Sequence, residues 1–553
     1  MASSTVSDVE KTPPTYEKGV SGPDSSNGDV AVGQVGEIPN FEEVGELRQG
    51  LQQRHIQMIA LAGAIGTGLF LGSGSAIAKG GPLGAFLGYT FVGCLVIGVM
   101  MSVAELSALV PLSGATVRHA EYFVDPALSF AQGWNSLYSW FVSLPAELTA
   151  AAVIVSFWDS TTTAAAWIVL FGGLLVIANL LFVRVYGEME FIFASLKIIL
   201  IVGLNIMAIV IVAGGGPDHT VLGFKYWRDP GPFTQYLGIS GSLGQFLGFW
   251  TTFNNAVYSY SGIENVSLAA AETKSPRRNI PIAAKRIFWR VAIFYILSIF
   301  FVGLLVPSDD ENLLSGSGTA TASPFVIAAT RAGIQVVPHI INFVVLTSAW
   351  SSGNSSLLGA SRVLYGMAKE NHAPKVFLRT NRMGVPYVAV SFVALWCCLG
   401  FMSLSSSAAV AFEWLQDLVS VSTLVTWSVI CVVYLRFYYG MKAQGISRDE
   451  LPWKSHFQPY LAWGALSFFI LLLLTGGYTT FIKGDWDDET FVSSYIDIPL
   501  FFLLYFGYKF WKKTKIIGLH EMEIRKFIDI ANANPEPVPP PKKGWRKLNI
   551  LWE

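Results

Sequence analysis

Three ionisable residues lie inside or beside long apolar runs of this sequence, where a charge could carry chemistry. Lys197 lies within FIFASLKIILIVGL, Glu147 lies within SLPAELTAAAVIV, and Glu264 follows a run of hydroxyl side chains. A charge at the centre of a bilayer costs roughly 2.5–3.5 kcal/mol on insertion scales, so each of these groups needs a role. They could bind an ionic substrate or carry a proton. Each also has a structural alternative: a tether for helix carbonyls, a packing carboxylate, or a strut beside a gate.

A glycine-rich segment interrupts the first apolar run, which spans 57–77. It reads GAIGTG at 63–68, and glycine costs about 1 kcal/mol relative to alanine in a helix interior. Broken backbone at membrane depth survives only where it is buried in protein or lines a cavity. The segment therefore predicts a substrate cradle. The alternative is a close-packing face, because Gly68 and Gly72 form a small-xxx-small pair.

A second weak point occurs five spans later, where YSYSGIE at 258–264 interrupts the sixth apolar run. Spans one and six are the corresponding first members of two five-span halves. Glycine-interrupted segments at matching places in two halves indicate a transporter site at the repeat interface. An odd number of spans per half makes the repeat inverted. This pairing favours the substrate cradle over packing alone.

The composition indicates a polytopic membrane protein. Of 553 residues, 52% are hydrophobic and 14% are charged, whereas soluble domains carry about 25% charged residues. A net charge of −1 gives no indication of nucleic-acid binding. The spacing of the four cysteines is typical neither of a metal site nor of the disulfides of a secreted protein, so we expect free thiols that pack among apolar residues. With no HExxH motif and no nucleotide loop, we expect a protein that is not an enzyme and holds no metal or cofactor.

About twelve apolar windows are long enough to span a bilayer, which takes about 20 residues each. They lie at roughly 56–78, 82–109, 127–157, 164–183, 190–213, 243–270, 287–307, 336–366, 386–404, 408–436, 460–477 and 492–511. The predicted organisation is a disordered tail at 1–50, a ten-helix core at 51–436, helices eleven and twelve at 437–512, and a C-terminal tail at 513–553.

The charges of the connections predict the orientation. The sixth, eighth and tenth connections are basic, whereas the odd-numbered ones are poor in basic residues, so the positive-inside rule places both termini in the cytosol. These basic residues are Lys274, Arg277, Arg278, Lys285 and Arg286, then Arg362, Lys369, Lys375, Arg379 and Arg382, then Arg436, Lys442, Arg448 and Lys454. The cytosolic tails could bind ubiquitin-ligase adaptors, and Lys11 and Lys18 in the N-terminal tail are free for modification. After residue 512 we expect a basic amphipathic helix beneath the membrane or a solvated helical tail.

Five sequence blocks resemble the amino acid–polyamine–organocation superfamily, and more closely its fungal branch, the yeast amino-acid transporter family. They are GAIGTGLFLGSG at 63–74, KGGP at 79–82, MSVAELSALVPLSG at 101–114, SGIENVSLAAAETKSPRRNIP at 261–281 and WSSGNSSLLGASRVLYGMA at 350–368. The resemblance runs from about residue 52 to 515. It implies an all-α membrane protein with twelve transmembrane helices in a LeuT-like 5+5 inverted repeat, with helices one and six broken. It also implies proton-driven amino-acid uptake at the plasma membrane.

The resemblance also implies roles for individual residues. The break in helix one would receive the substrate carboxylate, and freed carbonyls of both breaks would accept its ammonium group. The implied substrate-binding residues are Ala64, Ile65, Gly66, Thr67, Gly68, Glu147, Tyr258, Ser259, Tyr260 and Ser261. Lys197, Glu147 and Glu264 would couple transport to protons. Relatives commonly have Phe or Trp where this chain has Tyr258, and its hydroxyl would favour a polar substrate.

We therefore expect a proton-coupled amino-acid symporter with a broad or neutral range, whose partners are the amino acid, H⁺ and the lipid bilayer. An acidic amino-acid permease is one alternative, and a non-transporting amino-acid sensor is another. Glu413 and Asp417, one turn apart, could tune selectivity or an outer gate, or form a solvated helix start. Glu188 and Glu190 are expected as solvated charges in the turn between spans four and five.

Overall fold

The computed structural model describes residues 66–112, 114–181, 186–217, 219–267, 275–314, 323–381, 384–482, 484 and 486–536. All of these belong to one compact unit, Pro39–Glu553. The N-terminal tail predicted at 1–50, with Lys11 and Lys18, lies outside the described residues, as do Ala64 and Ile65.

Every regular element in the described ranges is a helix, which confirms the predicted all-α class. The helices in the predicted windows are η1 (Gly68–Gly72) with α3 (Ser73–Leu109), α5 (Pro126–Val155), α6 (Ala164–Leu181), α7 (Tyr186–Val212), α9 (Ser242–Tyr260), the run of α10 (Pro276–Arg290), η4 (Val291–Ile296) and α11 (Leu297–Leu305), α14 (Val336–Lys369), α15 (Tyr387–Leu395) with η7 (Trp396–Leu404), α16 (Ala408–Ala443), α17 (Tyr460–Thr475) and α19 (Asp497–Lys512). The connecting elements are α4 (Ala115–Phe123), α8 (Lys225–Arg228), η2 (Tyr236–Gly238), η3 (Ile263–Ser267), α12 (Glu311–Leu314), α13 (Pro324–Arg331), η6 (Lys375–Leu378), η8 (Arg448–Glu450), η9 (Tyr478–Phe481), α18 (Asp488–Tyr495) and α20 (Ile524–Ala533).

Six of the described helices are long and apolar enough to cross a membrane, or seven if α18 and α19, bent by 41°, form one span. One of the six, Gly68–Leu109, contains the described end of the first predicted window and all of the second, separated by a kink at Gly81. α9 and α14 are long enough but are not among the six, because serine, threonine and asparagine interrupt their apolar sequence. Polar side chains in a spanning helix normally face the interior of the bundle.

The kink between the first two windows depends on Gly81, whose φ of +75° favours glycine. A Cβ at this position would lie 2.6 Å from the Pro232 carbonyl oxygen and 2.7 Å from Cα of Phe233. The amide of Leu83 donates to the same Pro232 oxygen over 3.0 Å. The long connection before α9 therefore packs directly on this turn.

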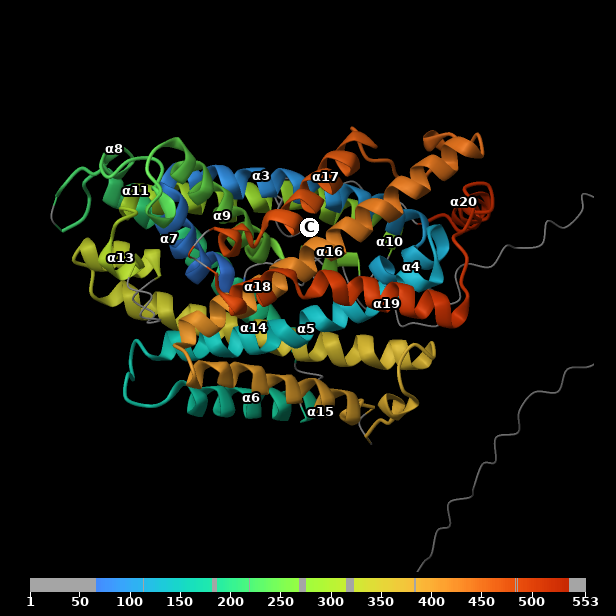
Figure 1. Ribbon diagram of the computed structural model, residues 1–553, viewed down its shortest axis with the longest axis horizontal. Coiled ribbons are helices and arrows are strands. Elements are labelled where there is room, and N and C mark those ends of the chain that lie inside the picture. Colours follow the sequence, from blue (N-terminus) through green and yellow to red (C-terminus); the bar gives the residue numbers. More distant parts are fainter. Residues whose placement is uncertain are drawn as a thin grey trace, which may run out of the picture. The chain divides into compact units, whose positions relative to one another are not determined.

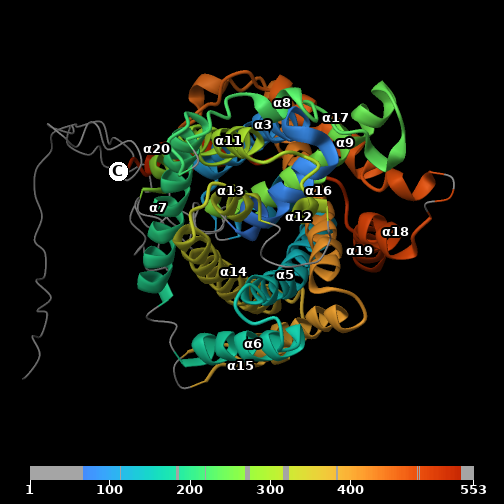
Figure 2. The ribbon, with the colours of Figure 1, turned by 90° about the vertical axis from the view of Figure 1, so that its left-hand side faces the viewer.

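The long helices lie in layers, seen in two views in Figures 1 and 2. α3 lies along α9, and α5 lies between α14 and α16. α6 and α15 pack together on the side of α5 and α14 that faces away from α3 and α9. α7 contacts both α11 and α14. The two polar helices, α9 and α14, thus lie among α3, α5, α7 and α16.

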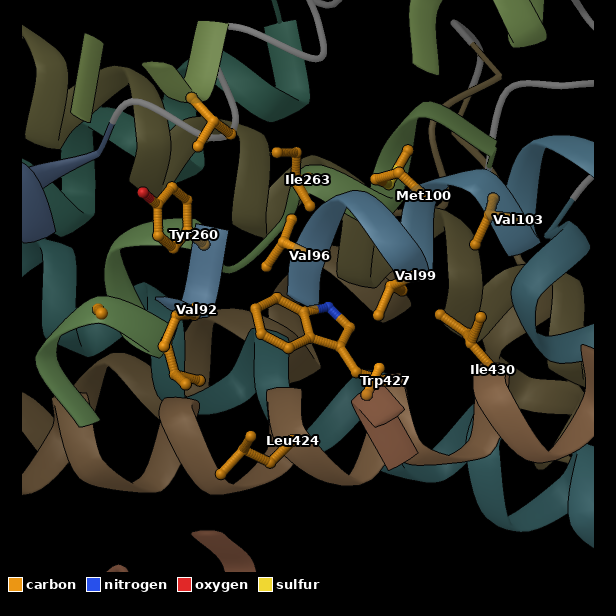
Figure 3. Close-up of a cluster of buried hydrophobic side chains, with 14 of the residues drawn as sticks. Val92, Val96, Val99, Met100, Val103, Tyr260, Ile263, Leu424, Trp427 and Ile430 are labelled. Carbon is orange, nitrogen blue, oxygen red and sulfur yellow. The ribbon is translucent and has the colours of Figure 1, made fainter. Parts of the chain in front are cut away.

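A large apolar cluster holds α3, α9 and α16 together beside the end of α9. Figure 3 shows the indole ring of Trp427 among Val96 and Val99 of α3, with Tyr260 and Ile263 nearby. Trp427, Val96 and Val99 have no exposed surface. Full burial of a large side chain contributes about 1.5–3 kcal/mol, so this cluster stabilises the position of α16 against α3.

The local sequence explains the start of α5. Asp125 is its N-cap and accepts from the amide of Ala127 over 2.9 Å, and Pro126 is the first helical residue. The side chain of Lys509 also donates to this carboxylate. Burial by itself raises the pKa of Asp125, but the hydrogen bonds from Lys509 and the Ala127 amide outweigh it and hold the pKa below its ordinary value.

The tenth connection, which is one of the basic ones, makes specific contacts with the rest of the folded structure. The side chain of Glu105, fully buried at the end of α3, accepts bonds of 2.7 Å from Arg448 and of 2.6 and 2.8 Å from Ser455. The guanidinium of Arg436 donates to the backbone carbonyls of Phe123 and Ile517. α20 buries its apolar face, and Phe527 lies 6.1 Å from Phe123, ring to ring. The C-terminal segment therefore forms an amphipathic helix that docks on the protein, which contradicts the expected solvated tail; its place beneath the membrane stays a prediction.

We predict that Arg448→Ala lowers the free energy of unfolding by about 3–5 kcal/mol, because it leaves the Glu105 carboxylate buried without its charged partner. Arg525→Ala is the control, since its ion pair with Glu450 is exposed and such pairs contribute about 0–1 kcal/mol. Thermal unfolding of the detergent-purified protein measures both. Adding Glu105→Gln to Arg448→Ala should recover part of the loss, and equal melting temperatures for the two single variants would contradict the assignment.

Candidate functional site

The interruption of helix six is present in the structure. α9 ends at Tyr260, Ser261 has extended backbone with φ −58° and ψ 147°, and Gly262 has φ +84°. A short 3-10 turn, η3, follows. Only glycine adopts such a φ without strain, so the sequence Ser-Gly fixes the position of the break. The chain thus carries the broken sixth helix that its sequence predicts; the inverted relation between the two halves stays a prediction.

The described part of helix one begins at the glycine motif. Gly66 lies in a bend, and helical backbone begins at Thr67, which makes no side-chain capping bond. The first five residues of the element, η1, have π-helical geometry, which occurs mostly at functional sites. The first amides of a helix lack partners within it and attract anions.

Glycines allow the start of helix one and the end of α9 to meet at their backbones. A Cβ on Gly68 would lie 2.8 Å from Cδ1 of Tyr258 and 3.0 Å from Cα of Ser259. A Cβ on Gly66 would lie 3.1 Å from Oε1 of Glu147. The hydroxyls of Thr67 and Tyr258 are 3.4 Å apart. The glycine motif therefore serves close packing and also exposes the helix start to Glu147.

Glu147 is a buried carboxylate at this junction, with 5% of its surface exposed. Its Oε1 accepts from the Ser352 hydroxyl of α14 over 3.0 Å. Its Oε2 is buried and has no hydrogen-bond partner among the described residues. An unpaired buried oxygen costs about 1–3 kcal/mol or more when charged, so the geometry is suited to a donor that arrives with a ligand.

Lys197 is buried on α7, with 1% of its surface exposed, and its charge interacts with two carboxylates, Glu190 and Glu147. Glu190 is 6% exposed and accepts from the Ser351 hydroxyl over 2.7 Å. The expectation that Glu190 is a solvated charge of the turn is therefore wrong. It failed because Glu190 lies within α7, at the contact with α14, where Ser351 donates to it. The side chain of Glu188 lies outside the described residues.

Tyr258 lies over the start of helix one and has an aromatic partner that the sequence did not indicate. Its ring meets that of Phe412 edge-on, with centroids 5.9 Å apart. Tyr258 and Phe412 belong to a small apolar cluster with Val142, Ala146, Ala150, Leu415 and Val419. α5, α9 and α16 thus contribute an apolar wall beside the Glu147 carboxylate.

Three neighbours of Tyr258 make contacts within the protein. The Ser259 hydroxyl donates to the Asn255 carbonyl over 2.9 Å and lies 3.0 Å from the Tyr89 hydroxyl. Tyr260 is fully buried and donates to the Tyr89 carbonyl over 3.1 Å. Ser261 donates through both its amide and its hydroxyl to the Tyr258 carbonyl. That carbonyl, one of the expected acceptors of the ammonium group, has both lone pairs engaged.

The remaining ionisable candidates occupy other places. Glu264 accepts from the indole nitrogen of Trp427 over 3.1 Å, beside the cluster of Figure 3. Glu413 is exposed near the start of α16 and lies 3.8 Å from the ammonium of Lys79. Asp417 accepts from Asn254 over 3.0 Å. The pair Glu413 and Asp417 thus joins α16 to α3 and α9, apart from the junction at Glu147.

Sequence reasoning missed the serines Ser351 and Ser352, which bind the two carboxylates from adjacent positions of α14. A signal was available, because both lie in the polar stretch WSSGNSS within an otherwise apolar helix. Glu190 also precedes Lys197 by seven residues, which puts both on one face of a helix.

The sequence is similar to those of known permeases. The sequence model of the family described as amino acid permease matches residues 55–521. A dicarboxylic amino acid permease of Saccharomyces cerevisiae is 38% identical over 90% of this chain and 82% of its own length. A proline-specific permease of the same yeast is 39% identical over 88% and 79%, and a general amino-acid permease of Candida albicans is 40% identical over 87% and 82%.

Among solved structures, an inward-facing conformation of Mhp1 is similar with a TM-score of 0.46 and 15% identity, over 87% of this chain and 96% of that one. At this level of likeness no conclusion about the fold follows. The family match covers nearly all of the described helices, and the curated relatives share more than a third of their residues with this chain. On that ground the chain belongs to the amino acid permease family.

Proposed function

We propose that this permease is a proton-coupled symporter that imports amino acids across the plasma membrane by alternating access. The observation that carries the proposal is the buried Glu147 carboxylate, which has one oxygen bound by Ser352 and one without a partner among the described residues, beside the start of helix one. An amino acid carries an anion and a cation a few ångströms apart. The junction offers a group for each charge: the start of helix one suits the anion, and the Glu147 carboxylate suits the cation.

In this proposal the substrate carboxylate accepts hydrogen bonds from the amides at Gly66, Thr67 and Gly68, where the helix dipole favours an anion. The α-ammonium donates to Oε2 of Glu147, which gives that oxygen its missing partner. A site built on these groups recognises what all amino acids share. Tyr258 and Phe412 then contact the substrate side chain and exclude water.

The surroundings of Tyr258 favour a broad or neutral range over acidic substrates. The wall formed with Phe412 is apolar, and a carboxylate at Glu147 would repel a second acidic group of the substrate. The relatives are named as dicarboxylic, proline-specific and general permeases, so their names are compatible with more than one range of amino-acid substrates. The acidic permease stays the alternative.

Lys197 is the proposed coupling group. A fixed ammonium buried within α7 would disfavour a sodium ion at the same place, and it could exchange a proton as its surroundings change during transport. A non-transporting sensor on the same fold would have no need for such a group. No covalent chemistry is proposed, and the proton gradient is the driving force.

The contacts of the basic connections support the proposed orientation. Arg277 donates to the Asn534 carbonyl, Arg436 donates to the Ile517 carbonyl, and Arg525 pairs with Glu450. These pairs bring two of the basic connections and the C-terminal segment to one face. By the positive-inside rule that face is cytosolic, and there the tails would be accessible to ubiquitin-ligase adaptors.

We predict that cells lacking their own permeases gain protonophore-sensitive uptake of at least one of radiolabelled alanine, proline, glutamate and arginine when they express this chain. Lys197→Ala should reduce that uptake by about tenfold or more, because it removes the proposed proton-carrying group. A barrier to transport that rises by about 1.4 kcal/mol already slows the rate tenfold. Substrate binding to purified protein should persist in the variant. Surface expression with binding but no uptake of any of the four would indicate the sensor, and sodium-driven uptake would contradict the role of Lys197.

We predict that Glu147→Gln raises the apparent KM of every transported amino acid by about ten- to a hundredfold, because a hydrogen bond to a charged group contributes about 1.5–3 kcal/mol. Ser352→Ala serves as the control: it keeps the carboxylate and removes only one of its donors, so its effect should be smaller. Kinetics of uptake over a range of concentrations, corrected for surface expression, measure both. An unchanged KM in Glu147→Gln would exclude direct contact with the ammonium group.

A further inference from the structure

Glu190 is a buried carboxylate that the mechanism above does not use. It lies in the first turns of α7, is 6% exposed, and accepts from Ser351 over 2.7 Å. A carboxylate buried inside a membrane protein is costly, and such groups commonly mark proton relays. Its hydrogen bond to one serine leaves most of that cost to be offset by a nearby cation.

Lys197 supplies that cation from the same helix. Seven residues are almost two helical turns, or about 10 Å along the axis, so both side chains lie on one face of α7. Long helical side chains lean toward the helix N-terminus, which directs Lys197 toward Glu190.

α14 binds both carboxylates through adjacent serines. Ser351 binds Glu190 and the adjacent Ser352 binds Glu147, over 2.7 and 3.0 Å. α14 contacts both α5 and α7, so neighbouring residues of one helix reach both acids. From α11, the contact with α7 includes Ser298 and Asn205, neither of which titrates. Lys197 is thus acted on by two acids, one at the substrate junction and one nearer the start of α7.

We propose that Glu190 is a second carboxylate of the coupling site, which accepts the proton from Lys197 and releases it on the cytosolic side. The inference rests on the proposed proton symport and adds the residue through which the proton leaves. In the step, the Lys197 ammonium gives one proton to the Glu190 carboxylate, which leaves a neutral amine and a neutral acid. The acid then loses that proton to cytosolic water, and the amine regains one from the substrate side.

The test separates proton coupling from substrate handling. Full-length protein is reconstituted into liposomes with whichever of alanine, proline, glutamate and arginine the wild type takes up fastest. Counterflow exchange without a gradient reports substrate binding and movement, and accumulation under an imposed pH gradient reports coupling. Glu190→Gln keeps an oxygen that can accept the hydrogen bond from Ser351, but the amide side chain cannot take up or release a proton. Glu190→Asp restores a carboxylate.

We expect Glu190→Gln to exchange substrate within about twofold of wild type yet to lose most of its accumulation, falling about tenfold or more. Glu190→Asp should recover accumulation at least in part. Asp497→Asn is the matched control, since Asp497 is also a buried carboxylate of a spanning helix and should keep wild-type accumulation when neutralised. Normal accumulation and an unchanged pH profile in Glu190→Gln would overturn the proposal, as would an equal loss in Asp497→Asn.

If Glu190→Gln does not fold, Ser351→Ala decides the question. It removes only the hydroxyl that binds Glu190 and should shift the pH at which uptake is half-maximal. Ser361→Ala is its control, because Ser361 is buried on the same helix and donates to the carbonyl of Leu358. Equal pH profiles for both would overturn the proposal. A wild type that exchanges substrate but ignores the pH gradient would instead overturn proton symport itself.

Discussion

The lipid interior offers no hydrogen-bond partners, and the arrangement of this permease depends on that constraint. Every interruption of a helix and every buried charge must be satisfied within the protein. The break at Ser261 and Gly262 obeys this rule, because Ser261 returns two hydrogen bonds to the carbonyl of Tyr258. The polar helices α9 and α14 are enclosed by more apolar ones. The site is therefore located where the fold can tolerate polarity.

The same constraint explains the grouping of the ionisable residues. Glu147, Lys197 and Glu190 come from two helices, and α14 binds both acids through adjacent serines. Opposite charges in a low-dielectric interior offset part of one another's desolvation, whereas a lone charge does not. A change at one member would alter the others, which is the property that the proposed coupling between substrate and proton demands. Glycine at 66 and 68 lets helix one approach this group and helix six at backbone distance.

Away from the site, different contacts fix the ends of the helices. The Glu105 carboxylate accepts hydrogen bonds from Arg448 and Ser455, and Arg436 donates to the carbonyls of Phe123 and Ile517. These contacts join the end of α3 to the connection between α16 and α17, and they join α4 and α16 to the C-terminal segment. The proposed alternating access requires some helices to move relative to others, and we expect helix ends tied in this way to move together. The apolar cluster around Trp427 extends the same unit into the membrane region.

The sequence alone determined the helical class, the windows of the spans, the break in helix six and the membership of Glu147 and Lys197 in the interior. Apolar length, glycine spacing and the cost of buried charge act locally along the chain, so they can be read from it. The tertiary structure decided which residues meet. Ser351 and Ser352 reach two acids because α14 lies between α5 and α7, and Glu190 is buried where α7 packs on α14. Tyr260 turned toward Tyr89, and α20 docked on the protein, because long-range packing selects one face of each helix.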